Sequence, residues 1–105
     1  MAKRKIIWSP EASRQFNEIL RYYNNRNKSK IYSRKLRNLL QESICLLQKQ
    51  PRIGKFLSGN YNNYRVLFIA RYHLFYEITD SFLYIHDIWD GRRNPENIKY
   101  YKKED

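Results

Sequence analysis

The sequence has one cysteine, three glycines and three prolines in 105 residues. A single cysteine excludes an internal disulfide framework, and we interpret Cys45, between Ile44 and Leu46, as a small buried apolar side chain. The scarcity of glycine and proline favours regular structure with short connections. No apolar run approaches the roughly 20 residues of a membrane span, and the basic N-terminus lacks the apolar stretch of a signal peptide. We therefore expect a soluble, cytoplasmic protein with no membrane partner.

Acidic side chains are also scarce, above all in the first half of the chain. Residues 1–50 hold twelve Lys and Arg against three Asp and Glu, whereas residues 51–105 hold nine against seven. The resulting net charge of +11 destabilises a compact chain by self-repulsion, so it predicts a polyanionic partner, either nucleic acid or an acidic protein segment. A length of 105 residues predicts one domain, residues 1–105, with one modest core.

Two amphipathic helices are expected in the first half. Ser9-Pro10-Glu11 is a helix start, because serine caps free backbone N–H groups, proline suits the first helical position and glutamate favours the positive helix end. Apolar residues then recur at helical spacing until the polar turn 24–27. A second helix is expected over 29–49, and Pro51 ends it. Its inward side chains are predicted to be Tyr32, Leu36, Leu39, Leu40, Ile44 and Leu47.

The second half changes to a period of two, which is typical of strands. After a first strand at 3–8, three more are expected at 64–69, 72–79 and 82–90, with turns short enough for antiparallel pairing. A short helical turn is expected near 95–100. The predicted class is α+β with the order β-α-α-β-β-β, an antiparallel sheet with a helix hairpin packed on one face.

Several segments resemble the RelE/ParE family of bacterial toxins. The segment IWSPEASRQFNEILRYY resembles the family's opening strand and helix, and PRIGKF, thirteen residues before YRVLF, resembles its Pro-x-x-Gly connection. YHLFYEI, followed by an isoleucine-rich strand and DGRRNP, is similar to the family's closing hairpin and basic end. The resemblance covers about residues 5–98 and implies a twisted antiparallel sheet with two helices on one side.

The resemblance implies a toxin that works in a pair with a cognate antitoxin, but it leaves the target open. Some members cleave messenger RNA on the ribosome without a metal, by attack of the ribose 2′-OH on the adjacent phosphate. Members of the ParE branch instead poison DNA gyrase and have no known hydrolytic site. A third interpretation is a binding-only relative that has lost toxicity. No cofactor is expected, and no dense cluster of carboxylates, histidines or cysteines predicts a metal site.

For RNA cleavage the candidate catalytic residues are Arg65, His73, Arg92 and Arg93. Arginines hold phosphate through a bidentate fork, and a histidine exchanges a proton near neutral pH. If they form an anion site, they should converge on the open face of the sheet. The structural alternatives are an Arg65 paired across the sheet with Glu77 or Asp87, a merely half-buried His73, and a solvated arginine pair.

The family's known catalytic residues match this set only in part. Its best-known RNA-cleaving members carry two lysines spaced by one residue on the first strand of this sheet, where the present chain has Arg65 and Leu67. Other members use a Glu, Arg and His set, which Glu77, Arg65 and His73 imitate in composition. His86 is a weaker candidate, and either Tyr100 or Tyr101 would stand for the family's C-terminal tyrosine.

A run of basic residues without an acidic one is the candidate nucleic-acid-binding surface. Its alternatives are contact with an acidic antitoxin and a solvated helix face. The run comprises Arg26, Lys28, Lys30, Arg34, Lys35 and Arg37.

Overall fold

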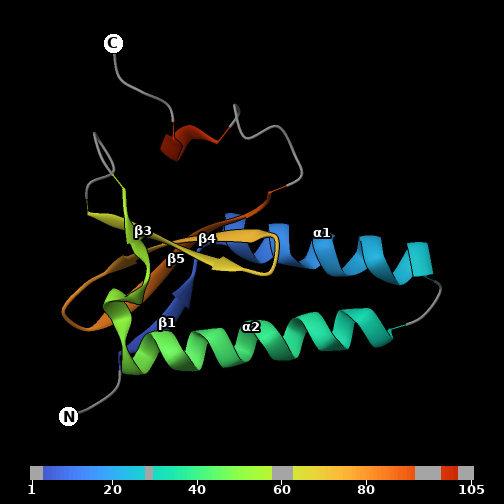
Figure 1. Ribbon diagram of the computed structural model, residues 1–105, viewed down its shortest axis with the longest axis horizontal. Coiled ribbons are helices and arrows are strands. Elements are labelled where there is room, and N and C mark those ends of the chain that lie inside the picture. Colours follow the sequence, from blue (N-terminus) through green and yellow to red (C-terminus); the bar gives the residue numbers. More distant parts are fainter. Residues whose placement is uncertain (1–3, 28–29, 58–62, 92–97, 102–105) are drawn as a thin grey trace.

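The computed structural model describes residues 4–27, 30–57, 63–91 and 98–101. Two long helices, α1 (Pro10–Asn27) and α2 (Ile31–Lys49), lie on one side of a five-stranded sheet (Figure 1). The Ser9 hydroxyl accepts a hydrogen bond from the Ala12 N–H at 2.9 Å, which confirms the predicted helix cap. Neither helix in these ranges is long and apolar enough to cross a membrane.

The sheet is mixed, with the strand order β1-β5-β4-β3-β2. The three longer strands form an antiparallel meander, as predicted, and β1 pairs in parallel with the first half of β5. This parallel pair joins segments from opposite ends of the chain, so the short connections of the sequence give no sign of it. The strands are β1 (Lys5–Trp8), β2 (Lys55–Phe56), β3 (Tyr64–Ile69), β4 (Tyr72–Ile78) and β5 (Phe82–Asp90).

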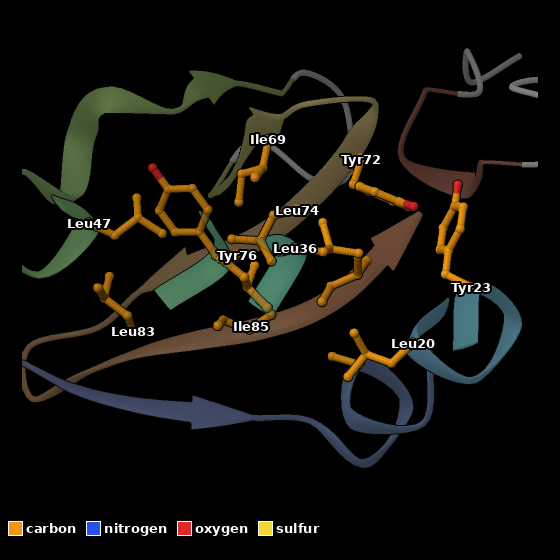
Figure 2. Close-up of a cluster of buried hydrophobic side chains, with 13 residues drawn as sticks. Leu20, Tyr23, Leu36, Leu47, Ile69, Tyr72, Leu74, Tyr76, Leu83 and Ile85 are labelled. Carbon is orange, nitrogen blue, oxygen red and sulfur yellow. The ribbon is translucent and has the colours of Figure 1, made fainter. Parts of the chain in front are cut away.

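The main core lies between the helices and the sheet (Figure 2). Leu20 from α1 and Leu36 and Leu47 from α2 pack against Leu74 and Ile85 of the sheet, all nearly or fully buried. A smaller cluster covers the opposite face, where a 3₁₀ turn at the end of the described chain packs on β3 and β4. This cluster contains Val66, Phe75, Ile98 and Tyr100.

Several helix predictions were wrong in detail. Helix α1 continues through 24–27 instead of turning there, and the Ser33 hydroxyl contacts the Asn24 side chain from α2. Cys45 is exposed, because the buried stripe of α2 passes through Leu40 and Leu47 and leaves position 45 on the outer side. Leu39, expected inside, is 39% exposed. The fold class itself is confirmed.

The connection from α2 to the sheet is fastened by one tyrosine. The Tyr76 hydroxyl accepts a hydrogen bond from the Gly54 N–H at 2.9 Å and donates one to the Pro51 carbonyl at 2.7 Å. A Cβ atom on Gly54 would come within 2.4 Å of that hydroxyl, so only glycine fits there. The Pro-x-x-Gly segment is therefore a structural clamp between α2 and β4.

Candidate functional site

The sheet face opposite the helices carries a shallow hollow of about 630 Å³. The tyrosines Tyr64, Tyr84 and Tyr100 line it together with His86 and Asp87. These side chains come from β3, β5 and the final 3₁₀ turn, so most of the chain must fold before the hollow exists.

A β-bulge in β5 brings two polar side chains to this face. Phe75 pairs with Asp87 and Tyr76 pairs with Ile85, so His86 is an extra residue between them. The normal alternation of a strand is thereby interrupted, and His86 and Asp87 both reach the open face. His86 stacks on Tyr64 with ring centroids 4.4 Å apart.

The bulged histidine pairs with a carboxylate. Its Nε2 lies 3.0 Å from Oε1 of Glu77, whose other carboxylate oxygen accepts a hydrogen bond from the Asn63 amide at 2.8 Å. The His86 ring also contacts Tyr84, with centroids 4.5 Å apart. The imidazole is held by a carboxylate at one nitrogen and by two rings, which fixes its orientation.

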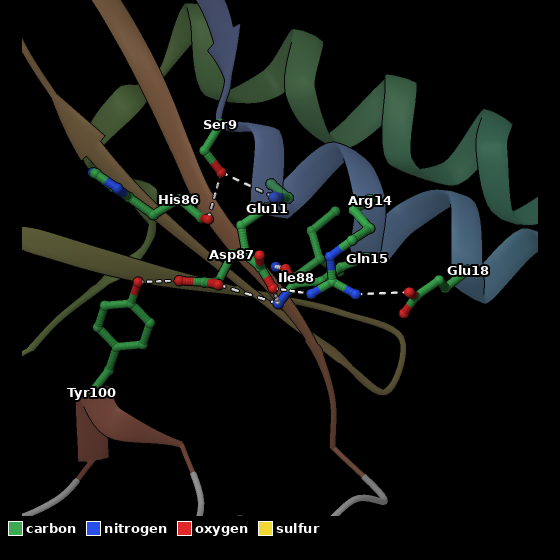
Figure 3. Close-up of polar contacts among 10 residues, drawn as sticks. Ser9, Glu11, Arg14, Gln15, Glu18, His86, Asp87, Ile88 and Tyr100 are labelled. Carbon is green, nitrogen blue, oxygen red and sulfur yellow. Dashed lines mark hydrogen bonds and ion pairs between the residues drawn. The ribbon is translucent and has the colours of Figure 1, made fainter.

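Asp87 ties the hollow to α1 and to the end of the described chain (Figure 3). It accepts hydrogen bonds from the Tyr100 hydroxyl and from the Gln15 amide, the latter at 3.1 Å. The Gln15 carbonyl oxygen accepts the Ile88 N–H at 2.7 Å, which satisfies a donor on the strand edge that β1 does not cover. Tyr100 also stacks on Phe75 at 4.2 Å, so it is part of the packing.

Arg65 lies on the other face of the sheet. It pairs with Tyr76 of the helix-side core, is only 9% exposed, and its Nη1 donates to the carbonyls of Arg52 at 3.0 Å and Gly54 at 2.8 Å. Its guanidinium carbon lies 3.7 Å from the centroid of the Phe56 ring. Arg65 thus contacts backbone carbonyls, and neither Glu77 nor Asp87 is its partner.

His73 lies on the open face, opposite Phe68 and Trp89 in the register. Burial lowers the pKa of His73, and the carboxylate of Asp90 opposes this shift only in part. Because Arg65 points to the opposite face, the prediction that these two residues converge is wrong. The register explains this, because residues two apart on a strand point to the same face. Arg65 therefore shares the face of the core residues Leu67 and Ile69. Arg92 and Arg93 lie outside the described residues.

The hollow is richer in carboxylates than in cations. Glu11, Glu77 and Asp87 line it, whereas Lys99 is its one lysine or arginine among the described residues. An arrangement of this kind repels a phosphate unless a cation from elsewhere joins it.

The predicted basic surface is solvent-exposed wherever it is described, and Lys28 falls outside those residues. Arg26 lies in the last turn of α1, and the remaining cations lie before or along the first half of α2. Among the described residues none of them has a carboxylate partner. The exposed members are Arg26, Lys30, Arg34, Lys35 and Arg37.

The residues that the hollow does gather are only weakly indicated by the sequence. His86, Glu77 and Tyr64 come together only because the bulge changes the parity of β5 after Ile85. The visible signal was the run Tyr84, Ile85, His86, Asp87, in which two polar residues follow each other inside a strand.

The chain matches the model of a known protein family over most of its length. The model of the ParE toxin of the type II toxin–antitoxin system parDE matches residues 6–95. The chain belongs to the ParE toxin family. The match extends from β1 beyond β5 and thus includes the strands, both helices and the bulge. None of the proteins with curated descriptions matches the chain.

Solved structures agree on the fold of this ParE-family chain. The chromosomal ParDE system of P. aeruginosa superposes with a TM-score of 0.68 at 14% identity, covering 84% of this chain and 96% of that one. The E. coli DinJ–YafQ toxin–antitoxin complex gives 0.58 at 18% identity, covering 85% and 93%. YafQ of E. coli BL21(DE3) gives 0.55 at 17% identity, covering 84% and 93%. At these identities the likeness concerns the fold alone.

Proposed function

We propose that this ParE-family toxin arrests growth in the bacterial cytoplasm by binding DNA gyrase and is neutralised by a cognate antitoxin. The observation that carries the proposal is the position of Arg65. Its guanidinium is buried against two loop carbonyls, so it is not available to a phosphate, and His73 lies on the other face. RNA cleavage needs cations and a proton-transfer group at one place.

The exposed basic residues of the helix hairpin supply the binding surface. Arg26, Lys30 and Arg34 carry charges that no described carboxylate neutralises. Such a surface attracts polyanions and loses affinity as salt rises. In the proposed function it contacts the DNA held by gyrase, and Arg92 and Arg93 remain candidates for an additional anion contact.

The antitoxin is inferred by analogy with the ParDE and DinJ–YafQ systems, which are toxin–antitoxin pairs. A net charge of +11 suits an acidic partner that covers the toxin and thereby lowers its self-repulsion. The acidic partner and the DNA would both bind the exposed basic side chains, so the binding of one would exclude the other.

A second candidate function is ribosome-dependent cleavage of messenger RNA. The observation that favours it is the His86–Glu77 pair in an open, tyrosine-lined hollow. A histidine oriented by a carboxylate can move a proton, and such catalysis contributes typically 10²–10⁴-fold. The ribosome would then have to position the RNA.

One pair of assays separates the two functions. The purified chain is added to a gyrase supercoiling reaction, and message ends are mapped in cells after induction. We expect loss of supercoiling and intact messages. Replacing Arg34, Lys35 and Arg37 by alanine should weaken the inhibition, whereas the matched changes Lys49→Ala and Lys55→Ala, also at exposed lysines, should not.

The contrary result is also well defined. Growth arrest with normal supercoiling and messages cut during translation would overturn the gyrase proposal. Abolition of that cutting by His86→Gln would then assign the hollow as a nuclease site. Normal growth at high levels of folded protein would remove both functions and leave a binding-only relative.

A further inference from the structure

A second hollow of about 400 Å³ lies between α1 and the last part of β5. Strand β1 follows β5 only as far as the pair Trp8–Ile85, and beyond that point the helix runs beside the strand edge. Tyr22 and Tyr23 from α1 and Tyr72 from β4 contribute to its walls. Tyr22 and Tyr23 meet at nearly a right angle, with ring centroids 5.0 Å apart.

The charge in this pocket is opposite to that of the whole chain. Glu11, Glu18 and Asp90 line it, and Arg14 is the one lysine or arginine that the described part of the chain contributes to it. Arg14 already shows how a guanidinium lies there, because it bridges Glu11 and Glu18 on the helix surface (Figure 3). Among the described residues, one guanidinium and three carboxylates line the pocket, which is a local excess of negative charge on a chain with a net charge of +11.

A buried hydroxyl gives the second indication of a ligand. Tyr72 is 3% exposed, and its hydroxyl has no hydrogen-bond partner of good geometry in the described part of the chain. The Tyr23 hydroxyl lies nearby, and Figure 2 shows both directed towards the end of β5. Burial, and secondarily Tyr23, raises the pKa of Tyr72, so this phenol stays neutral at physiological pH and can accept a hydrogen bond.

We propose that this pocket receives one arginine or lysine side chain from a protein partner that is acidic overall. A guanidinium suits it best, because it stacks on tyrosine rings and donates several hydrogen bonds to carboxylates and to a phenol. The net charge of +11 repels a basic partner. The cation must therefore arrive on a segment whose other charges are negative. This assignment is independent of whether the toxin acts on gyrase or on RNA.

Trp89 provides a readout, because its indole resonance responds to changes around a residue that lines the pocket. Trp89 lines the pocket, whereas Trp8, the other tryptophan, stacks on Phe16 elsewhere. The purified chain is titrated with N-acetyl-arginine methylamide and followed by the two indole resonances in NMR spectra. We expect the Trp89 signal to move and the Trp8 signal to stay. The citrulline analogue, which has the same shape without charge, should leave both unchanged.

Matched carboxylate variants test which groups are responsible. Glu18→Gln and Asp90→Asn should each weaken arginine binding about three- to five-fold, as expected for a partly exposed ion pair. Glu42→Gln, an equally conservative change on exposed α2, should not alter it. Tyr72→Phe should weaken binding while the folded spectrum persists.

Three results would overturn the proposal. They are equal shifts with arginine and citrulline, a Trp89 shift that the glutamine and asparagine substitutions do not change, and a larger shift with N-acetyl-glutamate methylamide. If a pocket variant fails to fold, the comparison of arginine with citrulline on the unmodified chain decides alone. A lysine probe that binds more weakly than arginine supports the stacking argument, and one that binds more tightly contradicts it.

Discussion

The Tyr76 hydroxyl offers the sharpest test of how this toxin fold is held together. Tyr76→Phe keeps the buried ring and removes only the oxygen that accepts from Gly54 and donates to Pro51. Each partner left without a hydrogen bond in a buried site costs about 1–3 kcal/mol. The bond to Pro51 is only partly buried, so its loss lies at the low end of that range, and we expect the free energy of unfolding to fall by about 2–4 kcal/mol. That is a large part of the roughly 5–15 kcal/mol typical of a domain.

Urea unfolding followed by tryptophan fluorescence measures this loss. The midpoint should fall by about 1–2 M at unchanged slope, because a slope of roughly 1–3 kcal/mol per M is usual for small domains. The control is Tyr84→Phe at the open hollow, where the hydroxyl makes no hydrogen bond to the described residues. If both variants unfold at the wild-type midpoint, the Pro51–Gly54 clamp does not contribute to stability and the reasoning fails.

The other predictions concern four sites on both faces of the sheet. Gly91→Ala should cost about 1–3 kcal/mol in urea unfolding, since its Cβ would lie 2.6 Å from the Arg71 carbonyl oxygen; an unchanged midpoint would contradict this contact. Ala70→Gly should stabilise by about 0.5–1 kcal/mol because Ala70 has a φ of 53°, and a lower melting temperature would argue against strain there. Arg65→Met should destabilise by about 2–4 kcal/mol, and Arg65→Lys should recover less than half because it lacks the planar fork; wild-type stability of the methionine variant would reopen the phosphate role. The lowered pKa of His73 means that its stabilising contribution is complete above about pH 6.5 and is lost as pH falls through the folded pKa. His73→Gln should flatten that decline below about pH 6.5, and parallel curves for the two proteins would refute it.

The local sequence pattern predicted most of the helices and strands, but it did not predict which of them contact one another. Strands β3, β4 and β5 were predicted to within a residue, because alternating aromatic and aliphatic side chains identify them. The pairing of β1 with β5 was missed, since Lys5 and Phe82 meet only in three dimensions. Helix α1 was predicted too short, because polar Asn24 is helical through a contact with α2 that no local rule contains.

The same limit explains the candidate site. An arginine on a strand is visible in the sequence, but the face to which Arg65 points depends on the register of β3 against β4. Its hydrogen-bond partners are backbone carbonyls of a loop. Every residue has such a carbonyl, so the sequence gives no sign of which ones Arg65 contacts. The pairing of His86 with Glu77 depends on a single extra residue in β5, a detail that periodicity does not resolve.

The parallel pair of β1 and β5 has a consequence for the order of events during synthesis. Strand β1 and the start of α1 leave the ribosome well before β5, yet they pair with Ile85, His86 and Ile88 of that strand. Chains grow at roughly 5–20 residues per second, so the first strand waits several seconds with its edge unpaired. A chain truncated before β5 lacks the strand with which β1 pairs, and it lacks the two hollows that β5 residues line. The two hollows therefore form only after β5 has been made, so a partner that needs either hollow cannot engage the growing chain before that point.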